Sequence, residues 1–93
     1  MVWLLWAGGH TPNPAAGANT YAWACASCHG ADGTLGVQVA GAVATDLTVA
    51  VPSLDTDVLV DIAQNGTGAM PAPNLSRAEA RDVASYLVET FDP

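Results

Sequence analysis

The sequence predicts an all-α fold, in which three helices of one small domain are joined by irregular segments. Three stretches carry helix signals, residues 14–25, 55–65 and 77–90, and a residue able to cap the first turn stands at the start of each. The longest stretch between them, residues 34–52, has no helical period. Ninety-three residues leave room for one domain, and an apolar fraction of 51% is enough to fold it.

The first predicted helix covers residues 14–25. Asn13 can cap it, and Pro14 suits its first turn. Gly17 and Tyr21 are four residues apart and therefore share one face of the helix. Because glycine costs about 1 kcal/mol of helix propensity relative to alanine, Gly17 marks a place where another element approaches the backbone closely.

The alanine- and valine-rich segment 34–52, which follows a turn at Asp32-Gly33, has two interpretations. Its valines could form short strands. We favour a wrapped loop containing one short helical turn. A loop of this length is unusual in a compact domain, but the edge of a cofactor would give its apolar side chains a surface to bury against.

The second and third predicted helices each have a start, an end and an apolar face. The second begins at Asp55 or Thr56 and is stopped by Gly66. Its expected inner face consists of Val58, Leu59 and Ile62. Ser76 and Glu79 form a capping box for the third helix. The apolar stripe of the third helix consists of Ala80, Val83, Ala84, Leu87 and Phe91.

The run Cys25-Ala-Ser-Cys28-His29 indicates attachment of a c-type haem. Each thiol can form a thioether to one vinyl group, and the adjacent His29 can then bind the iron as proximal ligand. Two cysteines also have three other possible uses. They could form a disulfide or a thioredoxin-like dithiol, or they could bind zinc together with His29 and His10. The histidine directly after Cys28 favours haem over all three.

Met70 is the predicted second axial ligand of the iron. It is the only methionine apart from Met1, and it lies between a glycine-rich turn and Pro71, where a helix cannot form. A thioether is a soft, neutral ligand, and a histidine–methionine pair raises the reduction potential. Two alternatives are that Met70 fills a gap in the core and that His10 binds the iron instead.

The charge of the chain excludes several classes of partner. The formal net charge is −7, with two arginines and no lysine. Nucleic acids and anionic lipid surfaces both require a cationic protein surface, so neither is expected as a partner. We expect redox partner proteins with neutral or basic docking surfaces.

Residues 1–12 are predicted to be an apolar, irregular N-terminal extension of a domain that covers residues 13–93. The apolar run 1–6 is far shorter than the roughly 20 residues that span a bilayer, and no positively charged region of a secretory signal precedes it. Trp3 and Trp6 could attach the protein to a membrane or a complex, or cover its own surface. Covalent haem attachment nevertheless indicates a periplasmic or otherwise extracytoplasmic protein.

With these features the chain resembles the class I cytochromes c of the small bacterial type. The matching stretches are Gly17 and Tyr21, Cys25–Gly30, Asp32-Gly33, Asn65–Pro71 and Tyr86-Leu87, which together extend over roughly residues 14–91. The resemblance implies a cytochrome c fold around one haem c, with the first and last helices crossing at Gly17 and Tyr86. The sequence departs from the family in lacking the proline whose carbonyl usually accepts a hydrogen bond from the proximal histidine.

The resemblance also implies electron transfer, as a carrier or as the cytochrome domain of a respiratory or other redox assembly, and no enzymatic activity. Neither a nucleophile nor a general base has triad-like partners in the sequence. Two other functions stay open. One is a tethered structural subunit of a membrane complex. The other, less favoured, is a haem enzyme or gas sensor with a displaceable sixth ligand.

Overall fold

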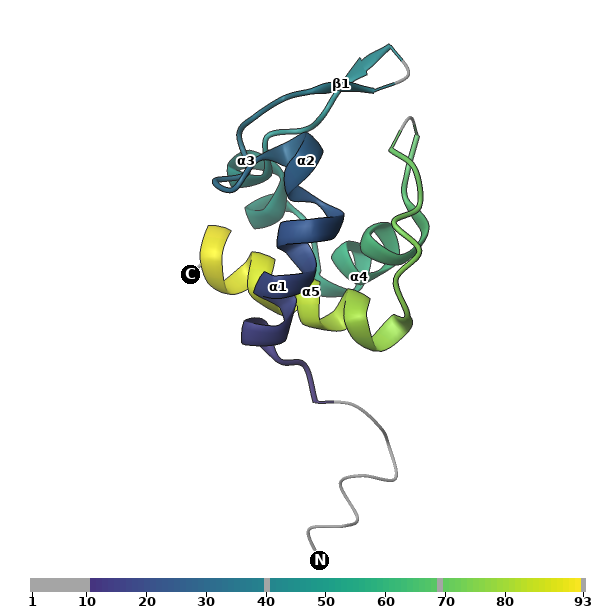
Figure 1. Cartoon of the computed structure of the whole chain (residues 1–93). Coiled ribbons are helices and arrows are strands. Elements are labelled where there is room, and N and C mark those ends of the chain that lie inside the picture. The colour runs from purple at the N-terminus through teal and green to yellow at the C-terminus, as the bar shows by residue number, and fades with distance from the viewer. Residues whose placement is uncertain (1–10, 40, 69, 93) are drawn as a thin grey trace, which may run out of the picture.

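The structure, a computed structural model, describes residues 11–39, 41–68 and 70–92, and these residues are mostly helical (Figure 1). The helices are α1 (Pro14–Ala24), α2 (Ala26–His29), α3 (Leu47–Ala50), α4 (Thr56–Asn65) and α5 (Arg77–Phe91), with a 3₁₀ turn at Val51–Ser53. The predicted all-α class is confirmed. Apart from its last two residues, the predicted extension 1–12, with Trp3, Trp6 and His10, lies outside the described residues.

Helix α1 crosses α5, and Gly17 makes the close approach possible. A Cβ atom at position 17 would lie 2.0 Å from the backbone oxygen of Asp82 and 2.9 Å from the Cβ of Tyr86. Beside this point the rings of Tyr21 and Tyr86 pack at 5.4 Å between centroids. The predicted reason for a glycine inside this helix is therefore confirmed.

The start of α1 is fixed by Asn13 and by a carboxylate from α5. The Asn13 side chain accepts hydrogen bonds from the backbone N–H groups of Ala15 and Ala16. The backbone N–H of Asn13 donates to Oδ1 of the buried Asp82 at 2.8 Å. This hydrogen bond joins residues 69 apart in sequence and ties the two helices together where α1 begins.

The predicted helix 14–25 ends one residue early, and a separate short helix follows. Cys25 has backbone angles of φ −123° and ψ −34°, outside the helical range, although its N–H still donates to the carbonyl of Tyr21. Its own carbonyl accepts from the N–H groups of Cys28 and His29, which starts α2. Gly30, with φ +83°, ends α2 in a conformation that favours glycine.

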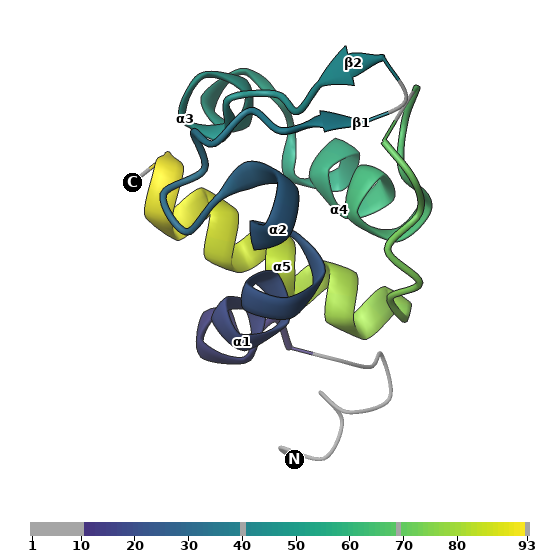
Figure 2. The ribbon, with the colours of Figure 1, turned by 45° about the horizontal axis from the view of Figure 1, so that its top comes forward.

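Segment 34–52 combines both interpretations made from the sequence. Strands β1 (Gln38–Val39) and β2 (Ala42–Val43) form a two-stranded antiparallel ribbon in which Gln38 pairs with Val43. The short helix α3 supplies the expected helical turn. In Figures 1 and 2 the ribbon lies at the same end of the molecule as the loop between α4 and α5.

The predicted bounds of α4 and the capping box of α5 are confirmed, but the predicted inner face of α4 is partly wrong. Val58 is 41% exposed, whereas Leu59, Val60 and Ala63 are buried. The buried face is rotated by about one residue because α4 packs against α5 on one side and borders a cavity on the other. Ile62 lines that cavity and is half-buried.

The core lies between α1, α4 and α5, and the apolar stripe of α5 is at its centre. Ala80, Val83, Ala84 and Leu87 are buried as predicted, and Phe91 packs against them at the edge. Two residues outside these helices complete the core, Val51 and Leu75.

Candidate functional site

An apolar cavity of about 380 Å³ opens beside this core. Its walls come from α1, α2, β2, α3, α4, α5 and the loop between α4 and α5. All four residues singled out from the sequence line it: Cys25, Cys28, His29 and Met70. The size falls in the range of about 300–1,000 Å³ typical of small-molecule and cofactor sites.

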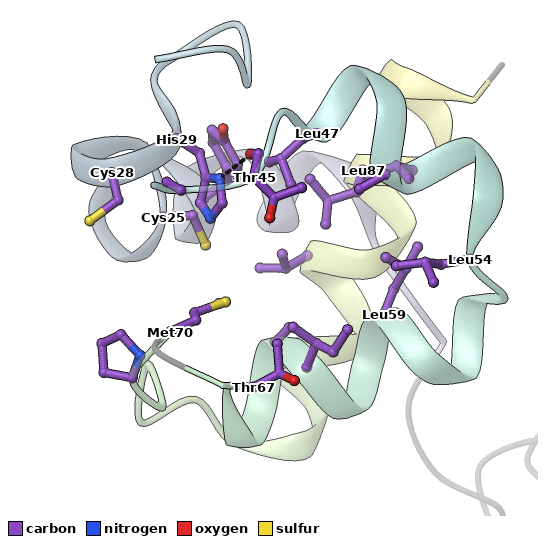
Figure 3. A pocket seen from close by; sticks show the side chains of 18 of the residues that line it. Cys25, Cys28, His29, Thr45, Leu47, Leu54, Leu59, Thr67, Met70 and Leu87 are labelled. Carbon is purple, nitrogen blue, oxygen red and sulfur yellow. Dashed lines mark hydrogen bonds between the residues drawn. The ribbon is translucent and has the colours of Figure 1, made fainter. Parts of the chain in front are cut away.

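His29 is held on one side of the cavity by a backbone carbonyl. The imidazole is buried, and its Nδ1 lies 2.9 Å from the carbonyl oxygen of Thr45 (Figure 3). Because a carbonyl can only accept, Nδ1 carries the proton and donates. In the neutral ring this leaves the Nε2 lone pair free for a metal.

The Thr45 carbonyl therefore accepts the histidine hydrogen bond for which this sequence offers no proline. The carbonyl of Thr45 directly precedes Asp46, the N-cap of α3. The Asp46 carboxylate accepts hydrogen bonds from the backbone N–H and the hydroxyl of Thr48, which fixes the chain at this point. A backbone acceptor leaves no signature in residue type, so no signal in the sequence could have identified Thr45.

The two cysteines lie beside His29 on the same side of the cavity. Neither forms a disulfide, both are half-buried, and the sulfur of Cys25 points into the gap toward Met70 (Figure 3). Burial raises the pKa of the Cys25 thiol to about 11, and the nearby Cys28 adds to the shift. Without a modification, Cys25 is therefore protonated at neutral pH.

Met70 faces this group from the loop on the opposite side of the cavity (Figure 3). Its backbone exchanges hydrogen bonds with Thr67, at 2.8 and 3.2 Å, which makes the loop a tight turn. Gly66 makes this turn possible, because a Cβ at position 66, where φ is +75°, would lie 2.5 Å from the Met70 carbonyl oxygen. The loop thus holds the thioether at the cavity wall.

Tyr21 is a site residue that sequence reasoning assigned only to helix packing. It lines the cavity and is buried, and its hydroxyl donates to the carbonyl of Gly30 at the end of α2. Burial is the main cause that raises its pKa to about 12. Its hydrogen bond ties α1 to the residue that follows His29.

Trp23 and the two arginines do not line the cavity. Trp23 is 63% exposed. Arg77 donates to the side chain of Gln64, and Arg81 lines a separate groove. Within the described ranges, no three His, Cys, Asp or Glu side chains are grouped so that they could hold a metal ion, so the zinc alternative gains no support there.

Residues 12–87 match the model of the protein family described as cytochrome c oxidase, cbb3-type, subunit III. The chain belongs to this family. It is a c-type cytochrome domain, which carries covalently bound haem c and functions in electron transfer with redox partners. No curated protein matched the sequence significantly.

The residues around the cavity fit the haem of this cytochrome domain. Two thiols and an imidazole with a free Nε2 lie on one side, a thioether faces them, and the remaining lining side chains are almost all apolar. Among the helices of residues 11–39, 41–68 and 70–92, none has the length and apolar character needed to cross a membrane.

Proposed function

We propose that residues 13–93 form a single-haem electron-transfer domain with histidine–methionine ligation. Cys25 and Cys28 hold the two vinyl-derived carbons as thioethers, His29 binds the iron through Nε2, and Met70 binds it through sulfur. The observation that carries this proposal is that His29 and Met70 face each other across one apolar cavity, with Cys25 and Cys28 beside the histidine (Figure 3).

When bound, haem c supplies a one-electron ferric/ferrous couple. The protein's own contribution is to keep the two ligands in place. The Thr45 carbonyl orients His29, the tight turn with Thr67 orients Met70, and the apolar lining excludes water. With both axial positions filled by side chains, the domain has no open site for a substrate, which favours a carrier over an enzyme.

We infer that the domain works in a respiratory or other redox assembly outside the cytoplasm, as a carrier or as a subunit. The family description names subunit III of a cbb3-type cytochrome c oxidase, and covalent haem attachment normally takes place outside the cytoplasm. Residues 1–12 remain a predicted extension, in which Trp3 and Trp6 could contact a membrane or complex. The net charge of −7 favours partners with neutral or basic docking surfaces.

The test is whether the Met70 sulfur occupies the sixth coordination position of the iron. We expect the reduced wild-type protein to resist carbon monoxide at neutral pH, and Met70→Ala to bind it, because the substitution opens that position. Visible spectra under carbon monoxide measure the difference, and a pyridine haemochrome spectrum verifies that both proteins carry haem c. The reduction potential of Met70→Ala is expected to fall.

His10→Ala is the matched control, because His10 is the only other histidine and was the competing ligand. It should leave carbon monoxide binding and the potential unchanged. If His10→Ala opens the sixth position and Met70→Ala does not, the ligation proposed here is wrong. If the wild type binds carbon monoxide readily, the result would support the alternative that the protein is a gas sensor or a haem enzyme.

A further inference from the structure

We propose that Gly33 and Phe91, neither of which lines the cavity, are positioning residues for the His29 imidazole. Gly33 lies in the turn that follows the haem-attachment motif, and Phe91 is the last residue of α5. The inference rests on the proposed function, in which His29 binds the iron, and it specifies what holds that ligand in place. Both residues act through the Thr45 carbonyl.

The backbone of residues 33–37, which we call the bridging segment, runs along the carbonyl groups of the motif. The N–H of Leu35 donates to the carbonyl of His29 at 2.9 Å. The N–H of Val37 donates to the carbonyl of Cys28 at 3.2 Å. Main-chain hydrogen bonds therefore fix the bridging segment relative to the residue that carries the imidazole.

The carbonyl groups of the bridging segment hold the chain on both sides of Thr45. The carbonyl of Gly33 accepts a hydrogen bond from the N–H of Leu47 at 2.9 Å. The last carbonyl of the segment accepts one from the N–H of Ala44, also at 2.9 Å. Thr45 lies between these two anchored residues, and its own carbonyl is the acceptor for Nδ1 of His29. A shift of the bridging segment must therefore move this acceptor relative to the ring.

Gly33 is the position at which the bridging segment is most closely enclosed. It is buried, and its φ of +80° is a conformation that residues with a side chain rarely adopt. A Cβ atom at this position would lie 2.9 Å from Cζ of Phe91 and 3.1 Å from the Cβ of Leu47. The end of α5 and the start of α3 therefore meet the bridging segment at a point that has room for hydrogen only.

The Thr45 carbonyl affects the electron donation of His29 as well as its orientation. A hydrogen bond donated by Nδ1 makes the opposite nitrogen, Nε2, more basic and so a better donor to a metal. Stronger donation stabilises the ferric state over the ferrous state and lowers the reduction potential. If the Thr45 carbonyl moves away from the ring, the donation weakens and the reduction potential should rise.

The experiment uses two test variants, each with a control of the same kind. Gly33→Ala is compared with Gly41→Ala, because Gly41 has a similar φ of +84° but a Cβ there would have open space around it among the described residues. Phe91→Ala is compared with Val88→Ala, because Val88 is another half-buried apolar residue of α5 but lines a separate groove. If Gly33→Ala does not mature with haem, the second pair decides alone.

The first readout is the exchange of the Nδ1 proton of His29 in D₂O, followed by NMR in the reduced, haem-carrying protein. Its rate is divided by the exchange rate of the backbone N–H of Ala84, which is fully buried in α5. We expect this ratio to rise about tenfold or more in the test variants, because the hydrogen bond to Thr45 opens locally. The controls should stay within about twofold of the wild type. A general loss of stability accelerates both protons together and leaves the ratio unchanged.

The second readout is the reduction potential, which should rise in the test variants and stay at the wild-type value in the controls. The inference is overturned if the exchange ratio of the test variants equals that of the wild type. It is also overturned if their potential is unchanged or lower, or if the controls change as much as the test variants.

The visible spectrum of the wild type distinguishes failure of this inference from failure of the proposed function. If the wild type carries no haem or does not cycle between two oxidation states, the proposed function fails and the inference fails with it. If the wild type cycles normally and the test variants have its exchange ratio and its potential, only the positioning role of Gly33 and Phe91 is wrong.

Discussion

At the scale of single residues, the buried imidazole of His29 depends on main-chain geometry. Its Nδ1 donates to the carbonyl of Thr45, and the same short stretch is pinned by the Asp46 cap of α3. A substitution of the Thr45 side chain would leave this acceptor in place, whereas a change that moves the start of α3 would displace it. The orientation of the His29 imidazole is therefore set by a neighbouring helix start.

The hydroxyl of Tyr21 makes the stability of the domain sensitive to alkaline pH. Burial raises its pKa to about 12 in the folded protein, against 10.0 for an ordinary tyrosine. The folded state therefore binds the phenolic proton more tightly than the unfolded state. This stabilisation is complete below pH 10 and is lost as the pH rises toward 12.

We expect the free energy of unfolding of the wild type to decrease as the pH rises above about 10. In Tyr21→Phe this decrease should be smaller, because the variant has no phenolic proton to lose. Urea denaturation at several values from about pH 8 upward measures the effect. Below about pH 9 the two proteins should have parallel pH profiles, which serves as the internal control. Identical profiles above pH 10 would show that Tyr21 does not contribute.

At the scale of elements, the crossing of α1 and α5 is the contact that aligns the site. Helix α1 leads directly into the short helix α2 that carries His29, and α5 supplies the core residues Val83 and Leu87, which also line the cavity. The absence of a side chain at position 17 brings the two backbones together. The position of the motif relative to the cavity wall thus follows from how closely these helices pack.

Gly17→Ala tests this crossing. In an open helix the change would stabilise the protein by about 1 kcal/mol through helix propensity. Here the added Cβ would lie 2.0 Å from the Asp82 backbone oxygen. The helices must move apart, so we expect a loss of about 2 kcal/mol or more in the free energy of unfolding.

Guanidinium denaturation measures this loss, and Ala22→Gly is the matched control on the exposed face of α1. The control should cost about 1 kcal/mol, as expected from propensity alone. A Gly17→Ala protein that is as stable as the wild type would show that the crossing tolerates a side chain.

The helices were predictable where short-range signals define their ends. The Asn13 cap with Pro14, the Ser76–Glu79 capping box and the Gly66 stop each act within one helical turn, and each has the predicted role. The break at Cys25 and the exposure of Val58 were not predictable. Both depend on which elements surround the helix, and that information lies far away in the sequence.

The residues of the candidate site also fall into two groups, those that the sequence could identify and those that only the fold could identify. Cys25, Cys28, His29 and Met70 could be named from the sequence, because thiols, an imidazole and a thioether have distinctive chemistry and spacing. The structure brings all four to one cavity. Thr45 contributes only a carbonyl group, which every residue has, so only the fold could assign it.

At the scale of the whole molecule, the cavity and the core share their walls. Val51, Leu59, Val83 and Leu87 are all buried, and all four line the cavity as well. A domain of 93 residues buries a modest fraction of its surface, and its free energy of unfolding is therefore expected to be small. We therefore expect the haem of this cytochrome domain to complete the core and to couple folding to cofactor attachment.

Removal of the haem should consequently unfold the domain. We expect the double variant Cys25→Ala/Cys28→Ala, verified as haem-free by intact-mass analysis, to lose about 5 kcal/mol or more, comparable to the whole stability of a small domain. Near-ultraviolet circular dichroism during heating should show no cooperative transition. Ser27→Ala is the control, because Ser27 lies in the same motif but is exposed; it should keep both the haem and the transition. A haem-free double variant that melts cooperatively at the wild-type temperature would show that the core is complete without the cofactor.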